Sequence, residues 1–532
     1  MGPRITWRGG TSGAIGIVAA ALFVASLSGQ TPKKSPADAA FDAFWSALSP
    51  QRAGQLTEPI LRSGITFSDA YDRLRRGPTY AAAKTGVVQL SRRNQDGVDH
   101  FYALNVPDTY DAARRYQVRI QLHGGVGGRA SSAPVGNGSV GALAGAEQIY
   151  VIPYAWNAAP WWSDDQVENL TGIVDAVKRL YNVDENRVVV SGVSDGGTGV
   201  YYLAMHETTP FASFLPLNGY WMVLAMADID DGRLFPNNLR NKPFFAVNGG
   251  RDPLYPTRVV DPYIAHMKQG GMSVDYHPQP TAGHNTAWWP EVKDTYEAFV
   301  RDHPRKPLPD TLTWEASDSG IHNRAHWLIV DKVAGRPAGA GDKALADLND
   351  MPEPPAADFG ARSSGTRINR VMPGSNAEKI GLQAGDVLMH VNDATIPSSV
   401  DVSEALEDVK PGSKLELLVA RNNLPVELTG IYDPPIAPSP PRHLFARGVP
   451  SGRVDLTRSG NTVEAVTRGV KAFTLLLSPD QFDFSKPLKV IANGRTVFEG
   501  KIEKDLKTLL KYAAADNDRT MLFGAELHIT LD

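Results

Sequence analysis

The stretch that decides the fold is Val188-Val189-Val190-Ser191-Gly192-Val193-Ser194-Asp195-Gly196, an apolar run that leads into a GxSxG pentapeptide. This pattern predicts a strand that turns sharply into a helix, with the hydroxyl of Ser194 presented at the turn. The flanking glycines lack the Cβ atoms that would collide with neighbouring backbone there. Glycine and serine are common in turns, so the pentapeptide gains its meaning only from the surrounding sequence.

The segments around this turn alternate between helical and strand patterns. Apolar residues recur at helical spacing over residues 167–180, and residues 198–206 can continue as the next helix. Residues 211–217 form another buried stretch that leads to a strand. Alternating helices and apolar strands predict the α/β class with a doubly wound parallel sheet. An exposed serine of this kind requires such a setting.

A serine hydroxyl is a weak nucleophile, so it needs a base to take its proton and a carboxylate to orient that base. Asp252 follows the apolar run 243–247, and His284 lies in a glycine-containing loop. The order Ser, Asp, His along the chain is that of the α/β-hydrolases. Alternatively, Asp252 begins a turn and His284 is a structural histidine of its loop. The coincidence of all three residues in loops after strands favours catalysis.

Acyl transfer also needs hydrogen-bond donors for the oxyanion that forms on the attacked carbonyl. Residues 116–122 have the pattern of a strand that runs into His123-Gly124-Gly125-Val126-Gly127-Gly128. The backbone N–H groups of this loop can turn toward the site, and the residue after the nucleophile, here Asp195, supplies a second donor in α/β-hydrolases. A glycine-rich loop can instead cradle phosphate, but no GK[ST] or GxGxxG pattern accompanies this one.

From about Arg92 to Arg305 the chain resembles secreted α/β-hydrolase esterases of the feruloyl esterase and polyhydroxybutyrate depolymerase kind, and more loosely the prolyl oligopeptidase catalytic domain. The matching pieces are GVDHFYALNVP, LHGG, GVSDGG, NGGRDPLY and AGHNTAWWP. The resemblance implies a catalytic triad and a set of candidate oxyanion donors, which are Ser194, Asp252 and His284 for the triad and Gly124, Gly125 and Asp195 for the donors. Many relatives have a small or amide residue where this chain has Asp195, so the substrate does not transfer with the resemblance.

Aromatic residues crowd the same loops, before the helix at 167–180 and after His284. Large aromatic side chains more often complete a core than bind a ligand. Ligands nevertheless bind at the carboxyl edge of the sheet in open α/β folds. We expect at least one of these rings to line the substrate site, with Trp162 and Tyr154 as the candidates.

Composition excludes several functional classes. The formal charge of −4 and the dispersed Lys and Arg residues provide no basic stripe for nucleic acid. The HExxH and HxH spacings of zinc sites are missing, so no metal or cofactor is expected. The absence of cysteine excludes a thiol nucleophile and disulfides, which suits a bacterial periplasm or culture medium.

The first residues have the layout of a secretory signal peptide over residues 1–29. Arg4 and Arg8 precede the apolar stretch 14–27, and small residues follow it. A membrane anchor is the alternative interpretation. No later segment approaches 18 continuous apolar residues, so we expect a mature chain without a membrane span that is periplasmic or secreted.

At 532 residues the chain is too long for one core. The predicted order is a signal peptide (1–29), a helical lead-in (30–85), the α/β-hydrolase domain (86–308), possible first strands of an accessory domain (309–333), a linker (334–357), a PDZ-like domain (358–432), a Pro-rich linker (433–452) and a β-rich accessory domain (453–532). We expect residues 311–333 to pair with the C-terminal strands, which would make the PDZ-like domain an insertion. A role of the lead-in in covering the active site is a less favoured alternative.

The resemblance to bacterial PDZ modules rests on PGSNA at 373–377 and GLQAGD at 381–386. It implies a short helix after the first motif, a second helix over residues 400–409 and a strand over residues 414–420. PDZ domains bind an extended peptide at a sheet edge and capture its carboxylate with loop amides. The capture loop near 359–362 departs from the usual apolar pattern, so a spacer role stands beside a peptide ligand.

Three functions are compatible with these patterns. The leading hypothesis is an exported serine hydrolase that cleaves small or polymer-borne carboxylic esters through an acyl-enzyme. An exported serine peptidase is the second, because of the prolyl oligopeptidase likeness and the PDZ-like module. The third is a non-enzymatic binding protein with a vestigial hydrolase unit, against which the intact set of three residues argues.

Overall fold

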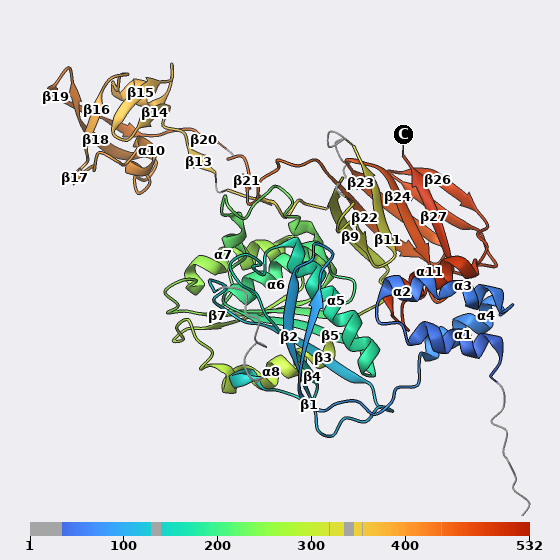
Figure 1. Ribbon diagram of the computed structural model, residues 1–532. Helices are drawn as coiled ribbons and strands as arrows, with labels where there is room; N and C mark the ends of the chain where they lie inside the picture. Colours follow the sequence, from blue (N-terminus) through green and yellow to red (C-terminus); the bar gives the residue numbers. More distant parts are fainter. Residues whose placement is uncertain are drawn as a thin grey trace, which may run out of the picture.

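The computed structural model describes residues 34–128, 140–318, 320–334, 345–353, 355–437 and 439–531. The expected signal peptide, residues 1–29, lies outside this part of the chain. A helical bundle and a β-rich domain lie beside a larger α/β unit, and a small β-rich unit stands apart on a two-stranded stem (Figure 1). Within the described residues no helix is both long and apolar enough to cross a membrane.

The α/β unit is built on one eight-stranded sheet. Its spatial order is β1 (Gly86–Arg93), β2 (Asp99–Val106), β4 (Ile149–Pro153), β3 (Tyr116–Leu122), β5 (Val183–Val193), β6 (Ser213–Leu217), β7 (Phe244–Gly249) and β8 (Val274–Gln279). The strands from β4 to β8 are parallel, as expected. β1 and β2 are antiparallel, so the sheet is mixed rather than entirely parallel. These two strands form a hairpin whose short turn needs no crossover helix.

Helices cover both faces of this sheet. α5 (Asp164–Leu180), α6 (Asp195–His206) and α7 (Thr257–Gln269) share one apolar core with Val188 and Val190 of β5. α8 (Trp289–Asp302) packs on the other face, where Val189 points. Because neighbouring side chains of a strand point to opposite faces, a strand covered on both sides is apolar throughout. Burial on both faces of the sheet explains why the residues before Ser194 are a run of valines.

The N-terminal helices belong to the C-terminal body of the molecule. They are α1 (Pro36–Trp45), α2 (Pro50–Gln55), α3 (Thr57–Arg62) and α4 (Phe67–Arg76), and they surround α11 (Leu506–Asp516), as Figure 1 shows. Phe41, Ile60 and Leu74 are buried with Leu509 and Leu510 of α11. The lead-in is therefore a structural bundle that shares its core with α11.

The accessory domain takes strands from two distant parts of the chain. Its sheets are β26-β25-β23-β22-β9 and β10-β11-β24-β27. The bounds are β9 (Thr311–Ser317), β10 (Arg324–Ala325), β11 (Leu328–Val333), β22 (Ser451–Ser459), β23 (Thr462–Arg468), β24 (Val470–Leu477), β25 (Leu488–Ala492), β26 (Arg495–Gly500) and β27 (Ala525–Thr530). β9 pairs with β22, and β11 pairs with β24, which is the pairing expected for residues 311–333. The PDZ-like unit is thus inserted between two strands of another domain.

The inserted unit has its own sheet and core. The sheet order is β14 (Ala361–Ser364), β15 (Arg367–Val371), β16 (Val387–Val391), β18 (Ser413–Arg421) and β19 (Leu424–Tyr432), and β17 (Ala394–Thr395) pairs with β16. Two short helices, α9 (Asn376–Ile380) and α10 (Val402–Ala405), accompany it. The helix expected over residues 400–409 was predicted too long, because the backbone N–H groups after Ala405 form short-range turn bonds.

The linkers at 334–357 and 433–452 were predicted as plain connectors. This is wrong for the parts nearest the PDZ-like unit, which form short paired strands. β12 (Asp350–Met351) pairs with β21 (Arg442–His443), and β13 (Ala356–Ala357) pairs with β20 (Ile436–Ala437). Leu348, Leu444 and Phe445 are buried in the core of the α/β unit. Low-complexity sequence surrounds these few apolar residues, and their partners lie far away along the chain. The stem of the PDZ-like unit is therefore anchored in the core of the α/β unit.

A buried ion pair joins the α/β unit to the accessory domain. Arg305 Nη2 lies 2.7 Å from a carboxylate oxygen of Asp518, and both side chains are at most 3% exposed. Burial by itself raises the pKa of Asp518, but the charge of Arg305 and other contacts outweigh it and lower the pKa to about 2. The ion pair compensates both charged groups for the hydration that they lose when the two domains pack together.

We predict that Arg305→Ala lowers the free energy of unfolding by about 3–5 kcal/mol, because it leaves Asp518 buried and unpaired. Thermal and denaturant unfolding measure the change. Arg301→Ala is the control, since its ion pair with Asp302 is exposed and should contribute little. Equal stability of the two variants would contradict the assignment.

The stabilisation from Asp518 should be complete above the ordinary pKa of 3.8 and lost as the pH falls through about 2.

Candidate functional site

Ser194 occupies a strained turn between β5 and α6. Its backbone has φ 57° and ψ −120°, a region that residues with a side chain rarely adopt. The Ser194 N–H donates to the carbonyl of Leu217 in the neighbouring strand β6 at 3.0 Å. The turn therefore holds the hydroxyl at the carboxyl edge of the sheet, where the loops that follow the parallel strands meet.

The glycines of the pentapeptide are required by close backbone packing. A Cβ atom on Gly192 would lie 2.2 Å from the carbonyl oxygen of Gly196. A Cβ atom on Gly196 would lie 2.2 Å from the carbonyl oxygen of Leu122, at the end of β3. Both distances are far below van der Waals contact, so the turn cannot form with any other residue at these positions.

Three side chains that are distant in sequence form one hydrogen-bonded chain. His284 Nε2 lies 2.8 Å from Ser194 Oγ, and His284 Nδ1 lies 2.7 Å from Asp252 Oδ2. The three residues follow β5, β7 and β8, whose carboxyl ends lie at the same edge of the sheet. If Nδ1 carries the proton, it donates to the carboxylate, and Nε2 is free to accept the serine proton.

Asp252 serves its own turn and the histidine with different oxygens. Its Oδ1 accepts the N–H groups of Leu254 and Tyr255 at 2.8 and 3.0 Å, and Oδ2 faces His284. The carboxylate is fully buried. Asp252 therefore caps its own turn and also contacts His284, so the two interpretations of this residue are compatible. The turn holds the carboxylate in the position where it contacts the histidine.

Asn218 supports the histidine loop, which sequence reasoning missed. It follows β6 with φ 47°, and its fully buried side chain donates to the carbonyl of Asn285 at 2.8 Å. The Tyr255 ring lies 5.7 Å from the His284 ring in an edge contact. The Asn-Gly dipeptide directly after an apolar strand was the available signal for Asn218, since asparagine tolerates positive φ.

The glycine-rich loop lies against Ser194. A Cβ atom on Gly124 would be 3.0 Å from Ser194 Cβ, and Gly125 has φ 68°. The His123 ring accepts the Ala155 N–H at Nε2 (3.1 Å), so Nδ1 carries the proton that meets the Gly124 carbonyl at 2.9 Å. Burial lowers the pKa of His123, which favours this neutral form. The loop next to Ser194 is thus fixed by a neutral imidazole.

The aromatic residues of the loops divide into buried and half-buried rings. Trp161 is buried, and its indole N–H donates to the His123 carbonyl at 2.8 Å, which is a structural role. Trp162 and Tyr154, the predicted substrate-binding residues, are half-buried. The Tyr154 ring lies 5.2 Å from the His123 ring. Their part in substrate binding stays a prediction.

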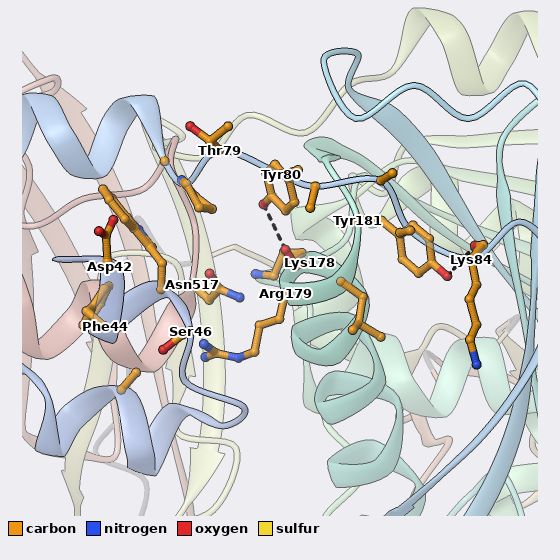
Figure 2. Close-up of a pocket in the computed structure, with 18 of the residues that line it drawn as sticks. Asp42, Phe44, Ser46, Thr79, Tyr80, Lys84, Lys178, Arg179, Tyr181 and Asn517 are labelled. Carbon is orange, nitrogen blue, oxygen red and sulfur yellow. Dashed lines mark hydrogen bonds between the residues drawn. The ribbon is translucent and has the colours of Figure 1, made fainter. Parts of the chain in front are cut away.

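A cavity of about 780 Å³ lies between the N-terminal bundle and α5 (Figure 2). Its lining includes Trp45, Tyr80, Lys84, Arg179 and Tyr181, and none of the three hydrogen-bonded residues. Tyr80 donates to the Lys178 carbonyl and Tyr181 donates to the Lys84 carbonyl, both at 2.9 Å. These bonds tie the segment that leads from the bundle to β1 onto the end of α5.

The sheet order, the serine turn and the inserted unit together decide the architecture. It is an α/β-hydrolase fold with an inserted PDZ domain. A PDZ domain family model matches residues 367–421, within the inserted unit. The described residues contain no cluster of three or more His, Asp or Glu side chains placed to hold a metal ion.

Curated relatives match parts of the chain. Serine protease HTRA1 of Xenopus tropicalis is 36% identical over 74 residues, which are 14% of this chain and 16% of that protein. The periplasmic serine endoprotease DegQ of Escherichia coli is 30% identical over 69 residues, 13% and 15% of the two lengths. "Probable feruloyl esterase C" of Aspergillus terreus is 26% identical over 165 residues, 29% of this chain and 56% of that protein. The chain thus spans about a sixth of the two proteases and just over half of the esterase.

Solved structures also resemble the chain over two fifths of its length. A thermostable esterase has 19% identity and a TM-score of 0.33, and the match covers 41% of this chain and 63% of the other. Esterase 2 of Thermogutta terrifontis has 16% identity and a TM-score of 0.34, with 41% and 94% covered. The fold assignment rests on the strand order and the serine turn described above.

We predict that Asn218→Gly slows labelling of Ser194 by a fluorophosphonate probe about fivefold to tenfold. Glycine keeps the positive φ but removes the bond to Asn285, which is worth about 1 kcal/mol. The labelling rate, followed by gel fluorescence, measures this effect. Asn422→Gly is the control, because Asn422 also has positive φ (52°) but lies in the PDZ domain. Unchanged labelling of the Asn218 variant would show that His284 does not depend on this support.

Proposed function

We propose that the protein is an exported serine hydrolase that cleaves carboxylic esters through an acyl-enzyme intermediate. The observation that carries the proposal is the continuous hydrogen-bonded chain from Asp252 through His284 to Ser194, with distances of 2.7 and 2.8 Å. A serine at a strained turn, a histidine within reach and a buried carboxylate behind it are the parts that nucleophilic acyl transfer requires.

In the first half of the reaction, Ser194 Oγ attacks the ester carbonyl carbon while its proton moves to His284 Nε2. The negative charge develops on the former carbonyl oxygen, and the proposed donors to it are the N–H groups of Asp195, Gly124 and Gly125. The imidazolium is stabilised by Asp252. It then gives its proton to the leaving alkoxide oxygen as the C–O bond breaks, which releases the alcohol and leaves Ser194 acylated.

In the second half, His284 takes a proton from a water molecule as the water oxygen attacks the acyl carbon. The same donors stabilise the second oxyanion. Collapse of this intermediate returns the proton to Ser194 Oγ and releases the carboxylic acid. Half-buried Trp162 and Tyr154 are the proposed contacts for the acyl or alcohol group. The cycle consumes one water and needs no cofactor.

Two candidate substrates follow from the composite architecture. The relative named feruloyl esterase covers the larger share of this chain and supports an ester, either small or carried by a polymer. The PDZ domain and the relatives named as serine proteases favour a peptide bond as the second candidate. The same three residues can perform both reactions.

We predict that short-chain and hydroxycinnamoyl aryl esters are hydrolysed while aminoacyl peptides are not. The Ser194→Ala variant should lose at least about 10⁴-fold in kcat, because the nucleophile is gone. Product release from both substrate panels, with the variant as background, measures this. Cleavage of peptides alone would replace the ester assignment with the peptidase, and equal rates of wild type and variant would dismiss Ser194 as the nucleophile.

Export is proposed from the N-terminal sequence pattern. We predict that protein isolated from the periplasm or medium of a bacterial host begins near residue 30, because the segment before it is removed on translocation. N-terminal sequencing and the mass of the purified protein measure the cleavage. A form without residues 1–29 should stay in the cytoplasm and keep its esterase activity. Recovery of the uncleaved chain in the membrane fraction would favour an anchor.

A further inference from the structure

The residue after the nucleophile makes a side-chain contact that its position alone does not require. Asp195 Oδ2 accepts the backbone N–H of Val126 at 3.0 Å. Val126 directly follows Gly124 and Gly125 in the loop that lies against Ser194, and it is buried. The carboxylate therefore bridges the start of α6 and the glycine-rich loop, two elements that are 69 residues apart in sequence.

The two ends of the glycine-rich loop are held by other groups. At its start, the His123 ring bonds to Ala155 and Gly124, and the His123 carbonyl accepts the Trp161 indole. Further along, the Gly128 carbonyl accepts the N–H of Asn157 at 3.1 Å. Between these anchors lies Gly125, whose positive φ of 68° turns the chain. The Asp195 carboxylate holds this middle part.

We propose that Asp195 is a positioning residue whose carboxylate aligns the loop half of the oxyanion hole with the half that its own backbone N–H provides. This inference rests on the proposed acyl-transfer function. One residue then fixes both donors relative to Ser194, because its N–H and its side chain share the same Cα. A loop displaced by even a fraction of an ångström would lose the alignment on which oxyanion stabilisation depends.

The hydrogen bond and the negative charge of Asp195 have opposite effects in this role. A carboxylate beside a developing oxyanion is unfavourable, since like charges repel strongly in a site with little water. The charge does reach the site: burial raises the pKa of Tyr255, and the charge of Asp195 raises it further. Asp195 is the first residue of α6, and the helix N-terminus partly offsets its charge. The acceptor oxygen is therefore the useful part of the side chain.

Three variants separate the acceptor oxygen of Asp195 from its negative charge. Asp195→Asn keeps an acceptor oxygen for the Val126 N–H and should retain kcat within about threefold of wild type. Asp195→Ala removes the acceptor and should lower kcat about 10²-fold, the usual loss for one oxyanion donor, with KM changed by less than about threefold. Asp231→Ala is the matched control, because Asp231 also accepts a backbone N–H at 3.0 Å, from Arg233 in an exposed loop.

The readouts are kcat and KM for a neutral aryl acetate and for a choline ester, and the inhibition constant of a trifluoromethyl ketone, which forms an oxyanion adduct. The ketone should bind Asp195→Ala about 10²-fold more weakly and Asp195→Asn nearly as well as wild type. If thermal denaturation shows that Asp195→Ala is not folded, Asp195→Ser replaces it. The serine side chain is shorter than that of aspartate, so its hydroxyl does not reach the Val126 N–H.

Three results would overturn the proposal. The first is an alanine variant within threefold of wild type, and the second is an asparagine variant as slow as the alanine variant. The third is a loss confined to the choline ester, which would assign the charge of Asp195 to substrate recognition. Ser194→Ala is measured in parallel. If that variant keeps full activity, the proposed function itself fails, whereas loss in Ser194→Ala with none in Asp195→Ala removes only this inference.

Discussion

The structure depends on one backbone turn that is unfavourable by itself. Ser194 adopts φ 57°, and a residue in such a region costs of order 1–3 kcal/mol. The turn persists because its surroundings leave no alternative: its N–H is bound by β6, and Gly192 and Gly196 bring α6 against the end of β3. The order β3-β5-β6 in the sheet is therefore a condition for the site as well as for the core.

The parts of the fold that sequence analysis predicted well have local signals. β3 begins and ends at the predicted residues 116 and 122, because a stretch of alternating apolar and polar residues is followed at once by a glycine-rich loop. Ser194, Asp252 and His284, which the structure joins by hydrogen bonds, could be named as candidates for the same reason, since each stands in a recognisable loop after a strand. Periodicity and turn residues act over a few positions, and they survive in the folded chain wherever tertiary contacts agree with them.

The features that were missed depend on partners far away in sequence. The Asn218 contact, the Asp195 bridge to Val126 and the packing of the N-terminal helices on α11 each join residues more than 60 positions apart. Leu348, Leu444 and Phe445 looked like parts of connectors because their apolar partners belong to the catalytic core. The average composition of a segment does not reveal one or two apolar residues that are buried against a distant core. Their burial in the structure does.

The meeting of α1–α4 with α11 constrains how the chain matures during synthesis. Residues 36–76 are made long before residues 506–516, and their apolar faces close only when those residues have been made. The catalytic sheet, complete by residue 279, can form well before that moment. Until residues 506–516 have been made, Phe41 and Leu74 lack the α11 side chains that share their core, and apolar surface left uncovered in this way favours aggregation. Closure of this shared core thus requires that the chain has been made at least as far as α11.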